Sequence, residues 1–342
     1  MHLKRVLPAE WHPQGAVMLT WPHGDTDWAY MLGEVEACFV RIAQAILARQ
    51  TLVVVCPDGP HVVSLLGAHD NLRVYELSSN DTWARDHGAI TVLEQDKPVL
   101  LDFKFNGWGL KFSANYDNLI TKRLFDNGAF ANGVAYENCL NVALEGGSIE
   151  SDGKGTILTT AECLLSPNRN GEWGKGEVER YLADKFGAKR VLWLHHGYLA
   201  GDDTDSHVDT LARLCDEQTI AYVKCTDKSD EHYEALAQME KELRMFSQAD
   251  GQPYRLVALP MATAAFDPVD GHRLPATYAN FLIMNHAVLF PVYQCDTDRE
   301  AIGAIREAFP NHEIVPVDCR ALIRQHGSLH CVTMQFPEGV VV

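Results

Sequence analysis

The chain has 342 residues, of which 46% are hydrophobic and 22% charged, so it can bury a large core and lies outside the composition range of disordered chains. Its 29 Lys and Arg face 46 Asp and Glu, a formal net charge of -17. A field of this sign disfavours nucleic acid and anionic membranes and favours cationic ligands. The sequence has no run resembling a membrane span or a signal-peptide core, so we expect a cytoplasmic protein.

The predicted elements alternate along the whole chain. Apolar runs rich in β-branched residues indicate strands, and apolar residues at three-to-four spacing indicate helices. In chain order these are helix 34–50, strand 51–56, strand 98–105, helix 116–127, hairpin 147–160, helix 177–187, strand 190–196, strand 219–225, helix 231–246, strand 255–260, strand 279–293, helix 298–309, strand 313–318 and strand 329–336.

This alternation predicts an α/β protein. The hairpin at 147–160, with DGKG between two strand-like runs, predicts antiparallel pairing within the sheets. A repeat of a strand pair, a helix and another strand is suggested. Because no Pro-rich or Gly/Ser-rich linker separates the helices, we expect a single catalytic domain over residues 1–342.

Several classes of site are disfavoured by the motifs that are missing. The nine cysteines include no CxxC pair, which argues against a zinc cluster, a thioredoxin-type motif and a disulfide framework. Neither GxGxxG nor GxxxxGK[ST] occurs, so a nucleotide cofactor is not expected. Adjacent residues on a strand point to opposite faces, which disfavours a metal site at His195 and His196. We expect no metal and no organic cofactor.

Polar and ionisable residues gather in four segments, 80–89, 144–150, 201–210 and 325–335. Each borders an apolar run, and strand ends are where α/β folds usually build sites. Together the segments offer a thiol, an imidazole and several carboxylates. Carboxylates around a thiolate make sense mainly if they hold a cation. A guanidinium fits, because two carboxylates can bind its donors in bidentate pairs and leave its carbon facing the sulfur.

Each signal taken alone also has a plainer structural interpretation. Asp86 with Arg85 would be an ordinary ion pair at a turn, and Glu145 before two glycines would cap a bulge. Cys331 in an apolar strand would be a buried small hydrophobe.

The third segment is equally ambiguous when it is taken alone. The acidic loop at 202–205 reads as a solvated surface. His207 and Asp209 lie two residues apart, so on a strand they would share one face whatever their role.

The motifs occur together and in one order: NDTWARD (80–86), FNGWG (105–109), LEGGS (144–148), TxxCLL (160–165), SHVD (206–209) and GSLHCVT (327–333). In this order they closely resemble the agmatine deiminase family, a peptidylarginine deiminase-like family of the guanidine-modifying penteins, in its compact bacterial form. The resemblance runs from residue 19 to residue 337. It implies a pseudo-fivefold α/β propeller built from strand-strand-helix-strand units.

The resemblance also implies roles for individual residues. Cys331 matches the nucleophile, and His207 looks like the general acid and base. Glu145 is similar to the carboxylate that orients the imidazole. Asp86 and Asp209 look like the two carboxylates that bind the guanidinium.

Five further positions concern the rest of the substrate or the entrance to the site. Trp83 looks like a wall of the slot for the alkyl chain, and Asp203 sits where relatives carry an acid near the distal amine. The HGSLHC segment departs from the longer glycine-rich run of many relatives, with His326 in place of a glycine. Arg85 and Arg169 are the nearest cations in the sequence that could receive a substrate carboxylate.

The implied reaction is hydrolysis of agmatine to N-carbamoylputrescine and ammonia through a cysteine thiouronium intermediate, without a cofactor. Alternatives are deimination of arginine or peptidylarginine, or a non-catalytic pentein that serves as a binding module. The expected partner is a small cationic guanidine, and we expect a symmetric homodimer because this is the commonest oligomer. Whether the reaction would serve polyamine biosynthesis, through putrescine, or agmatine catabolism stays open.

Overall fold

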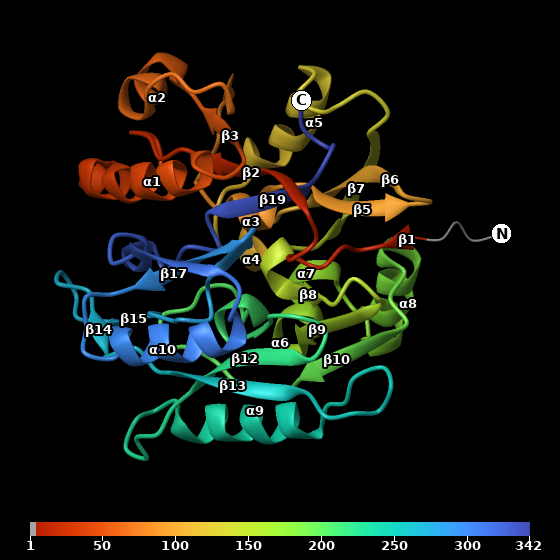
Figure 1. Cartoon of the computed structure of the whole chain (residues 1–342), viewed down its shortest axis with the longest axis vertical. Helices are drawn as coiled ribbons and strands as arrows, with labels where there is room; N and C mark the ends of the chain where they lie inside the picture. The colour runs from red at the N-terminus through yellow and green to blue at the C-terminus, as the bar shows by residue number, and fades with distance from the viewer. Residues whose placement is uncertain (1–4) are drawn as a thin grey trace.

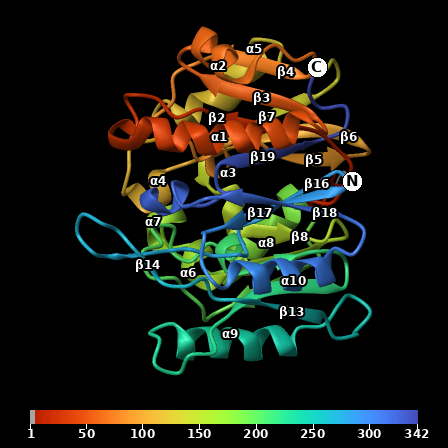
Figure 2. The same cartoon turned by 60° about the vertical axis from the view of Figure 1, so that its left-hand side comes forward.

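The computed structural model describes residues 5–342, shown in Figure 1. Within these residues lie five sheets of three or four strands and one two-stranded ribbon. The helix α2 lies at one end of the long axis and α9 at the other (Figures 1 and 2). None of the helices in residues 5–342 combines the length and apolar character needed to cross a bilayer.

The five larger sheets share one connection pattern. A first strand pairs antiparallel with a second, and a helix leads from the second to a third strand that runs parallel to it. The predicted repeat of a strand pair, a helix and a strand is therefore confirmed as connectivity, and the chain is mixed α/β as expected.

The units have the following bounds. The first contains β5 (Ile90–Glu94), β6 (Lys97–Lys104), α5 (Ile120–Asp126) and β7 (Ala135–Ala143). The second contains β8 (Ile149–Ser151), β9 (Thr156–Thr160), α8 (Lys175–Phe186) and β10 (Arg190–Leu194). The third contains β11 (Ala212–Leu214), β12 (Thr219–Lys224), α9 (Tyr233–Met245) and β13 (Arg255–Pro260). The fourth contains β16 (Leu282–Met284), β17 (Ala287–Val292), α10 (Asp298–Ala308) and β18 (Glu313–Asp318).

The fifth unit joins the two ends of the chain. Its first strand is β19 (Thr333–Pro337), which pairs with β2 (Gln14–Thr20), followed by α1 (Leu32–Leu47) and β3 (Thr51–Cys56). The helix α2 (Gly59–Leu66) and β4 (Leu72–Glu76) extend this sheet by a further parallel strand. Pairing of β19 with β2 therefore closes a sheet from segments more than 300 residues apart.

Short elements fill the connections. They are β1 (Arg5–Val6), the ribbon β14 (Ala265–Phe266) and β15 (Arg273–Leu274), the helices α3 (Ala84–His87), α4 (Gly107–Leu110), α6 (Ala161–Leu164) and α7 (Pro167–Asn170), and the 3-10 turns η1 (Ala29–Met31), η2 (Asp117–Leu119), η3 (Gly146–Ser148), η4 (Val208–Thr210) and η5 (Leu322–Gln325).

The sequence patterns explain most of these elements. The run TLVVVC forms β3 and is buried along nearly its whole length, as parallel strands covered on both faces are. In α1 the buried side chains Val35, Phe39, Ile42 and Ile46 recur at three-to-four spacing and form its core face. The hairpin at 147–160 is confirmed as the antiparallel pair β8 and β9.

Two predicted strands are wrong. The 279–293 run is two antiparallel strands, β16 and β17, joined by a tight turn in which His286 has φ 60°. Both strands are fully buried, so the hydrophobic pattern hid the turn between them. The 329–336 run begins as a turn, because the strand β19 starts only at Thr333.

A buried charge cluster ties three of the units to the N-terminal segment. The Arg213 guanidinium on β11 is fully buried and donates to Glu150 Oε1 at 2.5 Å and Glu10 Oε2 at 2.9 Å. It also donates to the Phe281 carbonyl at 2.5 Å, just before β16. These contacts offset the cost of burying the charges, because a buried charge without a partner is strongly destabilising.

We predict that Arg213→Ala lowers the free energy of unfolding by about 3–5 kcal/mol, since it leaves two buried carboxylates without their cation. Arg49→Ala is the matched control, because it removes an ion pair with the largely exposed Glu313 and should cost at most about 1 kcal/mol. Urea unfolding of both variants measures the difference. Equal losses in the two variants would contradict the assignment.

Candidate active site

The first strand of every unit is preceded by a short segment that carries a polar side chain. These side chains are Asp86 in α3 before β5, Glu145 before η3 and β8, His207 and Asp209 at η4 before β11, Asn280 before β16, and Cys331 before β19. Repetition of one connection pattern thus delivers a polar group from each unit. All six of these side chains are buried.

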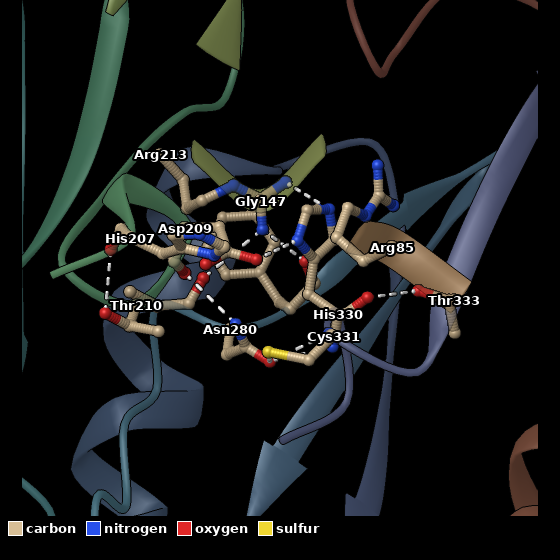
Figure 3. A network of polar contacts seen from close by, with 12 residues as sticks. Arg85, Gly147, His207, Asp209, Thr210, Arg213, Asn280, His330, Cys331 and Thr333 are labelled. Carbon is tan, nitrogen blue, oxygen red and sulfur yellow. Dashed lines mark hydrogen bonds and ion pairs between the residues drawn. The ribbon is translucent and has the colours of Figure 1, made fainter. Parts of the chain in front are cut away.

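Direct contacts link the segments. The Gly147 amide donates to Asp86 Oδ1 at 3.1 Å, and His207 Nδ1 lies 3.7 Å from the same oxygen. Asn280 connects Cys331 to Asp209. Its Oδ1 lies 3.3 Å from the Cys331 Sγ, and its Nδ2 donates to the Asp209 carbonyl at 3.3 Å. Figure 3 shows Cys331 beside Asn280 within this network. The five candidates from the motifs therefore lie in one cluster.

Asp86 has only uncharged hydrogen-bond donors. The Trp108 Nε1 donates to its Oδ2 at 2.9 Å, and the Gly147 amide donates to its Oδ1. Burial disfavours the charged form and raises the pKa of Asp86 to about 6.

Asp209 has a different environment. Its Oδ2 accepts a hydrogen bond from His330 Nδ1 at 2.7 Å, and its Oδ1 has no partner. Burial alone would raise the pKa of this carboxyl, but the hydrogen bond and charge of His330 outweigh burial and lower the pKa. Asp209 therefore keeps a charged carboxylate with one unoccupied oxygen.

His207 lies between carboxylates without a hydrogen bond to its ring. Both ring nitrogens are buried and unpartnered. Burial lowers the pKa of the imidazole, yet Asp86, Cys163 and Glu145 together outweigh it and hold the pKa well above its ordinary value. His207 is therefore placed to give a proton to a group that enters this space.

Glu145 lies within 4.8 Å of His207 and Cys163, measured between their ligand-type atoms. Its Oε1 accepts a hydrogen bond from Arg169 at 2.7 Å, and its Oε2 is unpartnered. The free oxygen is thus available to the imidazole, although no hydrogen bond joins them. Carboxylate, thiol and imidazole are also ligand types of zinc, so these three groups could hold a metal.

Cys331 carries an inert thiol in this arrangement. Burial raises the pKa of the thiol well above its ordinary value, and the charges of Asp209 and Asp86 raise it further. The thiolate, which is the nucleophilic form, is therefore disfavoured until something offsets those charges.

Gly147 allows the charged groups to approach one another. A Cβ at this position would lie 2.7 Å from His207 Nδ1, 2.9 Å from Asp86 Oδ1 and 3.0 Å from Asp209 Oδ2. Any side chain would enter the space that these three groups face. The second glycine of LEGGS is thus explained by the site itself.

A pocket leads from the surface to Cys331. It is lined by Asp27, Asp81, Trp83, Asp86, Trp108, Phe112, Asp203, Thr204, Gln325, His326, Gly327 and Cys331. Four of these residues are aspartates and three are aromatic, whereas none is Lys or Arg. The pocket is therefore shaped for a ligand with an apolar middle and positive charge.

The aromatic walls are held in place by hydrogen bonds and close packing. The Trp83 Nε1 donates to Asp81 Oδ2 at 3.0 Å, and its ring meets Trp108 edge-on at 6.1 Å. A Cβ on Gly327 would lie 2.1 Å from the Trp83 ring, so a glycine is required there. At the mouth, the Asp203 side chain is 38% exposed, and His326 Nδ1 lies 3.8 Å from its Oδ2.

The two arginines considered as receivers of a substrate carboxylate do not line this pocket. Arg169 is bound to Glu145 and Asp205. Arg85 is buried with Nη1 3.7 Å from the Met334 sulfur and Nη2 3.8 Å from a Glu10 oxygen. Within residues 5–342, the ion pair of Arg85 with Asp86 is not formed, so that interpretation is wrong.

Some local predictions around the site need correction. His207 and Asp209 do not lie on a strand, because His207 precedes the 3-10 turn η4 and Asp209 lies within it. Cys331 lies in the turn before β19 rather than in the strand. The acidic loop is not a plain solvated surface, since Asp205 pairs with Lys111 and Arg169.

Sequence reasoning missed three residues that contact the cluster. Trp108 is part of the quoted FNGWG motif, but its contact with Asp86 depends on a left-handed turn from Gly107 to Leu110, with Trp108 at φ 54°. Asn280 lies in an apolar run with no local signal. His330 is next to Cys331, and only the fold reveals its contact with Asp209.

The chain is similar to known proteins over nearly its whole length. The model of the Porphyromonas-type peptidyl-arginine deiminase family matches residues 6–337. A curated Marinomonas protein, provisionally named agmatine deiminase, is 33% identical over 97% of this chain and 94% of its own length.

Solved structures agree with these matches. A provisionally named arginine deiminase from Porphyromonas gingivalis is 56% identical with a TM-score of 0.95, over 99% of this chain and 100% of its own. A substrate-bound variant of the C. jejuni agmatine deiminase is 35% identical with a TM-score of 0.90, over 97% and 96%.

More distant structures share the fold alone. A DDAH from Pseudomonas aeruginosa and an amidinotransferase from Microseira wollei are each 12% identical to this chain, with TM-scores of 0.51 and 0.54. The fold is therefore a mixed α/β fold with neighbours among the penteins. From the match over residues 6–337, the chain belongs to the Porphyromonas-type peptidyl-arginine deiminase family.

Proposed function

We propose that this protein is an agmatine deiminase, a hydrolase that converts agmatine and water to N-carbamoylputrescine and ammonia. The observation that carries the proposal is the pocket: four carboxylates and three aromatic side chains line it, no Lys or Arg does, and it ends at a buried thiol. Agmatine carries a guanidinium at one end, an amine at the other and an apolar chain between them. Proteins named agmatine deiminase match nearly the whole chain.

In the proposed complex the guanidinium lies between Asp86 and Asp209. Two carboxylates can take its N–H groups in pairs and fix its plane. Its positive charge offsets the two charges that raise the pKa of the Cys331 thiol, so substrate entry promotes loss of the thiol proton to water. The nucleophile is then formed only when its target is present.

The first chemical step is attack of the Cys331 sulfur on the guanidinium carbon. A C–S bond forms, His207 donates its proton to one amino group, and the C–N bond breaks to release ammonia. A thiouronium remains on the sulfur. His207, whose pKa is held high by Asp86, is charged and able to donate at this stage.

The second step is hydrolysis of the thiouronium. His207, now neutral and oriented through the free oxygen of Glu145, takes one proton from water as the water oxygen attacks the carbon. The C–S bond breaks, the ureido product leaves, and the other water proton passes to the released ammonia. The protein groups that act in these two steps are the side chains of Cys331, His207 and Glu145.

The remainder of agmatine would fill the outer pocket. Its chain would pass along Trp83 and Trp108, and its amine would lie near Asp203 at the mouth. Arginine is the main alternative, because the P. gingivalis protein is provisionally named an arginine deiminase. An arginine carboxylate would meet aspartates and no lining Lys or Arg, so agmatine is the better substrate.

We further propose that the five units close into a pseudo-fivefold propeller around this site and that residues 1–342 form one catalytic domain. The pairing of β19 with β2, which joins the two ends of the chain, supports both statements. A cytoplasmic location and a symmetric homodimer also belong to the proposal.

We predict that the wild-type protein releases ammonia and a ureido product from agmatine and that Cys331→Ser lowers kcat at least about 1,000-fold, because the hydroxyl is a far weaker nucleophile at this pH. Cys56→Ser is the matched control, since Cys56 is a buried thiol on β3 outside the pocket lining. Substantial turnover by Cys331→Ser would sink the assignment.

We predict that kcat/KM for agmatine falls as the pH drops through about 6. The pKa of Asp86 is raised to about 6 by burial, so below this pH the carboxylate is protonated and loses its attraction for the guanidinium. A pH profile of kcat/KM measures the midpoint. A flat profile between pH 5 and 7 would rule out Asp86 as a charged ligand of the substrate.

We predict that Asp203→Asn raises KM for agmatine about 2- to 5-fold, the weakening expected from loss of one partly exposed ion pair. Butylguanidine, which lacks the distal amine, provides the control and should show the same KM with both enzymes. If Asp203→Asn weakened both substrates equally, Asp203 would not be the partner of the amine.

A further inference from the structure

The carboxylate of Asp209 is held from behind by a histidine that the proposed reaction does not use. His330 is 1% exposed, and its Nδ1 lies 2.7 Å from Asp209 Oδ2. Its Nε2 lies 2.7 Å from Glu10 Oε2. The ring thus bridges a carboxylate of the site and a carboxylate of the N-terminal segment, as Figure 3 shows for the Asp209 side.

Both ring nitrogens act as donors in this geometry. A nitrogen lone pair at 2.7 Å from a carboxylate oxygen would be repulsive, so each nitrogen carries a hydrogen. Arg213 Nη2 lies 3.2 Å from His330 Nε2, but a guanidinium can only donate, so this contact is not a hydrogen bond. Glu10 lies against both cations and offsets their repulsion.

The wider surroundings fix this arrangement. Arg213 is held by Glu150 at 2.5 Å, and Arg85 faces Glu10 from the other side at 3.8 Å. On the front of Asp209 the titratable groups are His207, Asp86 and Cys331, already placed in the site. The backbone of His330 is anchored as well, because its amide donates to Asn280 Oδ1 at 2.9 Å.

We propose that His330, fixed by Glu10, is a positioning residue of the guanidinium site: it holds Asp209 by one oxygen, keeps that carboxylate charged, and leaves the other oxygen free for substrate. This inference rests on the proposed function. It explains how the two guanidinium-binding carboxylates differ. Asp86 is held by the uncharged donors Trp108 and the Gly147 amide, whereas Asp209 is held by a cation.

The division of the Asp209 oxygens is the central point. The charged hydrogen bond to Oδ2 fixes the rotation of the carboxylate, while Oδ1 has no partner. A guanidinium that enters therefore finds an acceptor already oriented and ionised. Preorganisation of this kind avoids the cost of ordering the group during binding.

The test uses two variants of His330. His330→Leu removes both hydrogen bonds and the charge, whereas His330→Asn keeps one neutral donor that can reach Asp209. We expect kcat/KM for agmatine at pH 7 to fall about 100-fold in His330→Leu and about 10-fold in His330→Asn, the range for loss of a hydrogen bond to a charged group.

The second measurement is the acid limb of the pH profile, the fall of kcat/KM toward low pH. A residue with a merely structural role would not change the midpoint of this limb. Without the cation, burial raises the pKa of Asp209 above that of Asp86, so the midpoint that Asp86 sets in the wild type should move to higher pH by about one unit or more in both variants. His232→Asn is the matched control, because His232 is also buried and bonded to an aspartate, Asp230, and it should leave the midpoint unchanged.

Binding without turnover separates this inference from the proposed function. In a Cys331→Ser background, calorimetry should show agmatine affinity falling by the same factors when His330 is changed. If wild type turns over agmatine and the His330 variants keep its acid limb and affinity, the positioning role is wrong. If wild type does not turn over agmatine, the proposed function itself has failed. Should His330→Leu not fold, an unmoved acid limb in His330→Asn overturns the inference.

Discussion

The structure depends on one electrostatic constraint: two carboxylates and a thiol are buried together, and no Lys or Arg lines the pocket that leads to them. Buried negative charge is costly unless it is offset. Asp209 is offset from behind by His330. Asp86 has uncharged hydrogen-bond donors and His207 at 3.7 Å, and burial still raises its pKa to about 6. The missing positive charge is the one that a guanidinium would bring.

The fold meets this constraint by repetition. The five units share one connection pattern, and in each of them a short segment lies just before the first strand. Each of these segments contributes a side chain to the site. Local strain completes the site: Gly107, Trp108, Gly109 and Leu110 all have positive φ, and this turn aims the Trp108 indole at Asp86. Strain of this kind persists where the surroundings fix it, often at functional sites.

The sequence predicted much of this arrangement because the relevant information is local. The strand at 51–56 and the hairpin at 147–160 follow from hydrophobic patterning and turn chemistry, and both occur where expected. The motif residues Cys331, His207, Asp86, Asp209 and Glu145 could be picked out, and the structure gathers them, although their roles stay predictions.

Other parts depend on contacts that no local pattern records. The turn between β16 and β17 was invisible because both strands are apolar. Adjacency in the sequence predicts an ion pair between Arg85 and Asp86, yet the Arg85 guanidinium faces Met334 and Glu10. Asn280, Glu10 and His330 lie in different parts of the chain, and no local motif marks them. They reach the site only because the fold brings their segments together.

The most direct test of the account is mass spectrometry of wild-type enzyme quenched in acid during turnover of agmatine. Covalent catalysis predicts an adduct on Cys331 whose mass is that of agmatine less ammonia, formed within the first turnover. An enzyme that produces the ureido compound while Cys331 stays unmodified throughout, or with the adduct on another residue, would contradict covalent catalysis by this thiol.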